Sequence, residues 1–170
     1  MALDTMQDLL IAQLKDIYSA ESQIIKALPK LAKHASNEAL ADAFRTHLKE
    51  TEGQIARLDK IFESLGVSPR GKKCKGMEGL LAEGAETMEE KGDDAVLDAA
   101  LIADAQRVEH YEIAAYGSAK ALADILGHDE IVILLTQNEH EEIGADRKLG
   151  RIAEREVHPQ AATAVAEGGA

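Results

Sequence analysis

Apolar residues recur along most of the chain at alternating spacings of three and four positions, the period of one face of an α-helix. The first such run follows Thr5, a predicted N-cap with Asp8 three residues later, as in a capping box. It ends before Ser36 and Asn37, which supply the next cap. Its inward positions are Leu10, Leu14, Ile17, Glu21, Ile24, Leu28 and Leu31. The pattern predicts a long helix that buries one face.

Three more runs of the same period follow, and they cover residues 40–65, 95–116 and 131–152. Gly66 ends the first of these runs, and Gly127 forms the turn before the last. Gly92 and Asp93 break the chain and cap the helix that starts near Ala95. The chain is therefore expected to contain four long helices, joined in two hairpins with short turns near Ala35 and Gly127.

A single long connection, from Gly66 to about Glu90, links the two hairpins. It opens with a basic loop and continues as a short amphipathic helix from about Met77. Short turns make helices antiparallel, whereas a long connection between the second and third helices is the crossover of ferritin-like bundles. We predict an all-α, antiparallel ferritin-like four-helix bundle over residues 1–156, followed by a disordered tail over residues 157–170.

Composition supports this fold and excludes several function classes. The chain has 170 residues, 45% of them hydrophobic but only 3% aromatic, and its formal net charge is −12. Such acidity disfavours a nucleic-acid partner, which needs a concentrated positive face. Its one cysteine excludes an intramolecular disulfide, and no signal peptide or membrane span is evident. We expect a cytoplasmic protein.

Each predicted helix has polar residues in the middle of its apolar face, where core positions should be apolar. Apolar residues resume on both sides of every interruption. The inward polar positions are Glu21 in the first helix; His47, Thr51 and Gln54 in the second; Gln106 and Glu109 in the third; and Asn138 and Glu142 in the fourth. Glu50 lies on the adjoining edge of the second helix, and Glu112 and Asp146 follow one turn further along the third and fourth. Counting from the turns places Glu50 level with Glu21 and Glu112 level with Glu142.

Unpaired carboxylates in a dry core would repel one another and lose their hydration, at a cost of several kcal/mol each. No inward Lys or Arg is predicted at their level, so bound cations explain the pattern best. Carboxylates with an imidazole suit Fe or Mn. The pattern therefore predicts two metal ions, with iron preferred and manganese as the alternative.

The known di-iron plan takes one Glu from each of two helices and a Glu-x-x-His motif from each of the other two. This chain departs from that plan, because Gly53 follows Glu50 by three positions and Ala145 follows Glu142 by three. His47 precedes Glu50 instead. The expected ligand set is consequently rich in carboxylates.

The segments DIYSAESQ, THLKETEGQIARLD, CKGMEGLLAEGAE and DAALIADAQRVEHYEIAAYG resemble the bacterial YciF-like stress proteins from about Thr5 to Ala153. This family is assigned to the ferritin-like di-metal superfamily, is similar to rubrerythrins, and has dimeric members. The resemblance implies a homodimer and carries the four helical carboxylates onto Glu21, Glu50, Glu109 and Glu142. Further candidate ligands are Glu112 and Asp146, and His47 and Gln54 are expected to bind metal or to orient carboxylates.

Two functions remain open on the sequence. The first is a di-metal protein that acts on oxygen, peroxide or iron during stress. The second is a structural or interaction protein with a degenerate metal site, which the missing Glu-x-x-His motifs favour. An iron-storage cage is disfavoured, because a fifth C-terminal helix that would close it is not predicted. Tyr18 and Tyr111 are the tyrosines considered as hydrogen-bond donors near the site.

Overall fold

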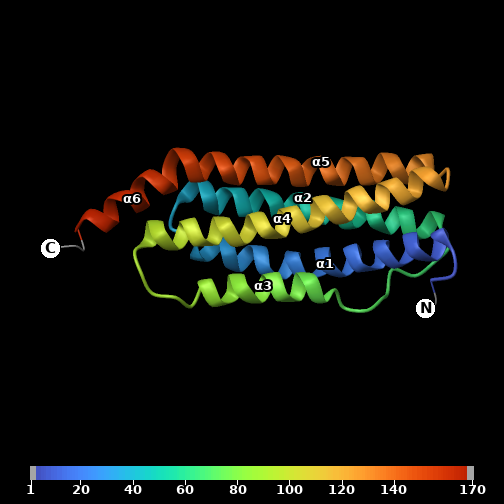
Figure 1. Ribbon diagram of the computed structural model, residues 1–170, viewed down its shortest axis with the longest axis horizontal. Coiled ribbons are helices and arrows are strands. Elements are labelled where there is room, and N and C mark those ends of the chain that lie inside the picture. Colours follow the sequence, from blue (N-terminus) through green and yellow to red (C-terminus); the bar gives the residue numbers. More distant parts are fainter. Residues whose placement is uncertain (1–2, 168–170) are drawn as a thin grey trace.

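The computed structural model describes residues 3–167, and these residues form helices joined by turns and loops (Figure 1). The four long helices are α1 (Met6–His34), α2 (Glu38–Ser64), α4 (Asp94–Ile125) and α5 (Asp129–Ile152). The other elements are α3 (Lys75–Thr87), the π-helical turn η1 (Ala153–Val157) and α6 (His158–Glu167).

The long helices pair as two antiparallel hairpins, α1 with α2 and α4 with α5, and the hairpins pack against each other (Figure 1). The crossover from α2 to α4 runs along the outside of the bundle, where α3 packs on α1 and α4. This is the predicted helical bundle with a long crossover between the second and third long helices. None of the helices within residues 3–167 is long and apolar enough to cross a membrane.

The local signals that delimit the helices are confirmed. Thr5 and Asp8 form a reciprocal capping box at the start of α1, and the Asn37 side chain accepts from the backbone N–H of Leu40. Gly66 and Gly127 adopt φ values of 65° and 71°, a left-handed conformation that favours glycine. The helix boundaries therefore follow from short-range chemistry.

The bundle core consists of two apolar clusters with a polar layer between them. One cluster includes Ile24, Phe44, Ile102 and Leu149, and the other includes Ile17, Leu58, Tyr116 and Leu135. Between apolar residues of these two clusters, every long helix has buried polar side chains; they are Glu21, His47, Thr51, Gln54, Glu109, Glu112, Asn138 and Glu142. Asp98, which is also buried, lies nearer the start of α4. Most of the polar interruptions of the sequence are thus buried inside the bundle, whereas Glu50, Gln106 and Asp146 are only partly buried.

Two details differ from the prediction. α3 begins and ends two to three residues earlier than predicted. The disordered tail is wrong for residues 157–167: Val157 is buried and ends η1, and residues 158–167 form α6, which packs beside α4. The pattern was missed because α6 is short and Ala-rich, and it continues from α5 through η1 without a break. Residues 168–170 of the predicted tail lie outside the described residues, and the domain boundary after residue 156 stays a prediction.

Candidate metal centre

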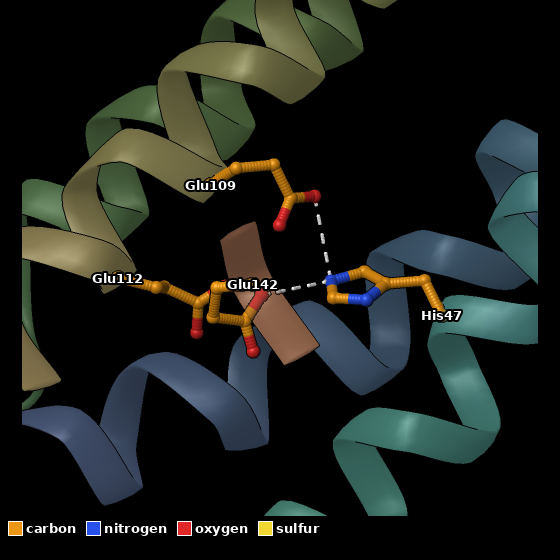
Figure 2. Close-up of side chains that lie close together, drawn as sticks. All are labelled: His47, Glu109, Glu112 and Glu142. Atoms are coloured by element: carbon orange, nitrogen blue, oxygen red, sulfur yellow. Dashed lines mark ion pairs between the residues drawn. The ribbon is translucent and has the colours of Figure 1, made fainter. Parts of the chain in front are cut away.

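Four side chains from three helices meet in the polar layer (Figure 2). His47 comes from α2, Glu109 and Glu112 come from α4, and Glu142 comes from α5. One ligand atom from each lies within 4.8 Å of those from the others, and all four residues are buried. This spacing is compatible with shared metal ions, because coordinating oxygens and nitrogens crowd around a common point.

His47 lies between the outside of the bundle and the carboxylates. Its Nε2 atom is 3.4 Å from Glu109 Oε1 and 3.6 Å from Glu142 Oε2, as the dashed lines in Figure 2 show. Its Nδ1 atom faces Glu50 Oε2 at 3.5 Å. A carboxylate behind an imidazole fixes the orientation of the ring and raises the basicity of its other nitrogen. His47 is therefore placed where it could bind a metal ion, with Glu50 behind its ring.

Glu21 brings the fourth helix, α1, to the centre. Its side chain is fully buried and accepts a hydrogen bond from the Tyr116 hydroxyl. Its carboxyl lies close enough to those of Glu112 and Glu142 to influence their charges. Carboxylates from three helices and an imidazole from the fourth thus surround one volume.

Neutral hydrogen-bond donors hold the buried carboxylates on the side away from His47. Gln54 donates to Glu142, and Asn138 Nδ2 donates to the Tyr116 hydroxyl at 3.0 Å. Arg57 in turn donates to Asn138 and to Glu141. Arg57, Asn138 and Tyr116 therefore form a chain of donors that runs from a partly exposed arginine to Glu21. The groups that contact Glu21 and Glu142, Tyr116 and Gln54, are neutral, so they fix these carboxylates without neutralising their charge.

Burial raises the pKa of Glu21, Glu109 and Glu112 well above the ordinary carboxyl range, because a charged group loses its hydration there. Repulsion between neighbouring carboxyl groups raises each pKa further. Burial and the negative charge of Glu21 also raise the pKa of Tyr116. A metal cation would reverse both effects, since it favours the ionised carboxylates.

The residues present fit bound metal. Buried polar groups are normally hydrogen-bonded, yet seven buried side-chain atoms within the described part of the chain have no hydrogen-bond partner. They are Glu21 Oε2, His47 Nε2, Gln54 Oε1, Glu109 Oε2, both carboxylate oxygens of Glu112, and Glu142 Oε2. All belong to the polar layer, and six of the seven are atoms that ligate metals well.

Glu50 and Asp146, two of the predicted ligands, lie at the edge of this group. The Glu50 side chain is 38% exposed. Asp146 is 22% exposed, accepts from Gln106 Nε2 at 2.9 Å and lies 3.4 Å from His110. Both residues stand roughly 70° around their helices from the centre of the buried face, because successive residues advance by about 100°. Their role as ligands stays a prediction.

Tyr116 contacts the carboxylate group through its hydroxyl, and the sequence did not reveal this contact. It occupies an apolar position of its helix face, where an aromatic ring packs well, and nothing in the pattern shows which way its hydroxyl points. Tyr18 and Tyr111, the tyrosines considered from sequence, contact other groups: Tyr18 packs edge-on against Phe62, and Tyr111 donates to Asp16 at 2.5 Å. Gln54 does lie next to a carboxylate, as expected.

Comparison with known proteins gives a consistent assignment. Residues 5–162 match the family described as Domain of unknown function (DUF892). Protein YciF of Escherichia coli (strain K12) is 46% identical over 162 residues, which cover 95% of this chain and 98% of that protein.

Comparison with solved structures gives the same relatives. The crystal structure of the E. coli stress protein YciF has a TM-score of 0.88 and 46% identity, covering 91% of this chain and 98% of that one. YcfI from Rhodopseudomonas palustris, named as a candidate structural protein, has a TM-score of 0.85 and 51% identity, covering 87% and 94%. A protein from Xanthomonas campestris pv. campestris, 19% identical with a TM-score of 0.70 over 88% and 92% of the two chains, shares the fold. The chain therefore belongs to the DUF892 family and is a YciF-like protein.

Proposed function

We propose that this chain is a stress-response protein that binds two metal ions in the polar layer, with iron as the preferred metal and manganese as the alternative. The observation that carries the proposal is the set of seven buried polar atoms without hydrogen-bond partners, gathered around one volume. Leaving a buried polar group unsatisfied costs about 1–3 kcal/mol, and more for a charged one. Bound cations would offset this cost.

Glu21, Glu109, Glu112, Glu142 and His47 would hold the metals, with Glu50 and Asp146 within reach as further carboxylates. Bound iron or manganese would supply redox and Lewis-acid chemistry toward oxygen, peroxide or ferrous iron. The chain itself contributes the arrangement: His47 presents Nε2 to the carboxylates, while Gln54 and Tyr116 fix two carboxylates by hydrogen bonds. The apolar clusters on either side of the layer exclude bulk water.

Elemental analysis of the protein, purified without chelators, tests the proposal against a Glu21→Gln/Glu142→Gln variant. We expect close to two metal ions per chain in the parent and a loss of at least half in the variant. Glu63→Gln/Glu83→Gln is the matched control, because both side chains lie on exposed helix positions. Equal, sub-stoichiometric metal in all three proteins would contradict the proposal.

A structural or interaction role with a degenerate site is the second candidate. The residues three positions after Glu50 and Glu142 are Gly53 and Ala145, so the histidines of the di-iron plan are missing. The description of the Rhodopseudomonas palustris relative favours the same role. This alternative predicts that metal-free and metal-loaded protein have the same thermal midpoint and that neither turns over peroxide or ferrous iron.

We further propose a cytoplasmic homodimer that does not bind nucleic acid. The net charge of −12 argues against a nucleic-acid partner, the single cysteine fits a reducing compartment, and the dimer is proposed from the resemblance to YciF-like proteins. Light scattering coupled to size-exclusion chromatography should give twice the chain mass of 18.3 kDa. A mass of 18.3 kDa, or of a large shell, would contradict the dimer.

A further inference from the structure

A cavity of about 310 Å³ lies between α2 and α5 and shares two residues with the candidate metal centre. Those two residues are His47 and Glu109, both buried. Thr46, His140 and Gly144 also line the cavity, and these three residues are exposed. The cavity therefore leads from the surface of the bundle to the imidazole and to one carboxylate of the centre.

Its inner end presents atoms that have no other partner. His47 Nε2 and Glu109 Oε2 are buried without a hydrogen bond, and each residue is at most 5% exposed. The His47 imidazole lies between an outer carboxylate, that of Glu50, and two inner ones, those of Glu109 and Glu142. Groups that can bind a cation therefore follow one another from the cavity to the centre. A cation could pass from one carboxylate to the next along this path.

The charges along the cavity favour a cation. Glu50 lines it from α2 and Glu109 lies at its inner end, while Glu141, which lines it from α5, is paired with Arg57. Lys148 and Arg151 also line the cavity, but they follow Glu141 by seven and ten residues and so lie about two and three turns further along α5. The acidic part of the cavity is thus the part that adjoins His47.

The cavity is large enough for a hydrated ion. A water molecule occupies about 30 Å³ of the liquid, so six waters around a cation need roughly 180 Å³. The volume of about 310 Å³ exceeds this requirement. A divalent cation could therefore enter with its hydration shell and exchange waters for carboxylate oxygens inside.

We propose that this cavity is the entry port through which a divalent cation reaches the buried carboxylates. The proposal rests on the proposed function, because a port requires a centre that binds metal. Gly144 provides the test: a Cβ atom added there would meet no atom within 4 Å, so a larger side chain can fill the cavity without disturbing the core. Gly144 is not among the ligands or their hydrogen-bond partners.

The experiment follows Co²⁺ binding to metal-free protein by stopped-flow visible absorbance and Co²⁺ release by chelator competition. Gly144→Leu should slow both binding and release about tenfold or more, because a barrier in the path raises both activation energies equally. The dissociation constant should stay within about twofold of the parent, since the port does not touch the bound state. Thr46→Leu, on the opposite wall, should act in the same direction.

Gly79→Leu is the matched control, since Gly79 is also an exposed helical glycine with open space around its Cβ position. It should load at the parental rate, and circular dichroism should show all variants folded. Unchanged rates of Co²⁺ binding and release in both Gly144→Leu and Thr46→Leu would overturn the port. A larger dissociation constant with an unchanged rate of binding would overturn it as well. Failure of the parent to bind Co²⁺ would instead overturn the metal centre, and the port with it.

Discussion

The Tyr116 hydroxyl donates a hydrogen bond to Glu21 across the bundle core, from α4 to α1, and both side chains are fully buried. The same hydroxyl accepts from Asn138. The tyrosine thereby links Glu21 of α1 with a chain of hydrogen-bond donors, which consists of Asn138 from α5 and Arg57 from α2. Its ring belongs to one of the two apolar clusters, so one residue forms part of both the core and the candidate centre.

Tyr116→Phe should lower the free energy of unfolding of the metal-free protein by about 1–3 kcal/mol. The substitution keeps the ring but leaves Glu21 Oε1 and Asn138 Nδ2 without their partner, in a place where water cannot replace it. Urea denaturation in the presence of chelator measures the change. Tyr18→Phe, at a partly exposed position, is the control and should cost less. Equal losses in the two variants would show that the buried hydroxyl has no special role.

Glu112→Gln should stabilise the metal-free protein at neutral pH, by about 1–3 kcal/mol. Neither Glu112 oxygen has a hydrogen-bond partner, and neighbouring carboxyl groups repel its charge, so a neutral group of the same size relieves both burial and repulsion. The sign should reverse with metal present, because the variant loses a ligand. Unfolding curves measured with and without Mn²⁺ test whether the change in the free energy of unfolding reverses its sign. Glu63→Gln, at an exposed position, is the control. A loss of stability without metal would be inconsistent with repulsion in the cluster.

The stability of the metal-free protein should fall as pH rises above the ordinary carboxyl pKa of about 4.3. Because the pKa values of Glu21, Glu109 and Glu112 are raised in the folded state, the folded chain holds more protons than the unfolded chain in this range. Unfolding then releases protons, and a higher pH favours it until the folded carboxyls also ionise. Urea midpoints between about pH 5 and pH 8 measure the slope.

Metal binding should show the opposite dependence on pH. Cations bind ionised carboxylates and neutral imidazole, so binding displaces protons and the affinity rises with pH. Titration with Mn²⁺ in two buffers of different ionisation enthalpy counts the protons released. In Glu112→Gln the number released should fall, and the pH slope of metal-free stability should flatten. A slope that is the same in variant and parent would assign the pH effect to other groups.

Asp98→Ala should destabilise the bundle by about 1–3 kcal/mol. Asp98, near the start of α4, is only 3% exposed and accepts from the backbone N–H groups of Ser36 and Asn37 at 2.9 and 2.7 Å. It thereby holds the α1–α2 turn from the other hairpin, through hydrogen bonds to a charged acceptor. Thermal unfolding measures the loss. Asp94→Ala, an exposed carboxylate one turn earlier, should have the smaller effect.

The sequence by itself determined the helices and the buried polar layer. Caps, turn glycines and the period of the apolar positions are local features, so Thr5, Gly66 and Gly127 could be interpreted without knowledge of any other helix. The interruption of all four apolar faces by polar residues also predicted that Glu21, Glu109, Glu112 and Glu142 are buried. Both conclusions depend only on which side of its own helix a residue occupies.

Only the tertiary structure decided which of these groups meet. Counting residues from the turns gives height along the bundle but not the rotation of each helix, which the packing of all four helices sets together. Glu50 was predicted to lie level with Glu21, yet it is partly exposed and lies behind His47. The Tyr116 hydroxyl and the reach of Asp98 to the opposite hairpin likewise depend on side-chain directions between helices distant in sequence. A single residue makes each of these contacts, so they produce no repeating pattern in the sequence from which they could be predicted.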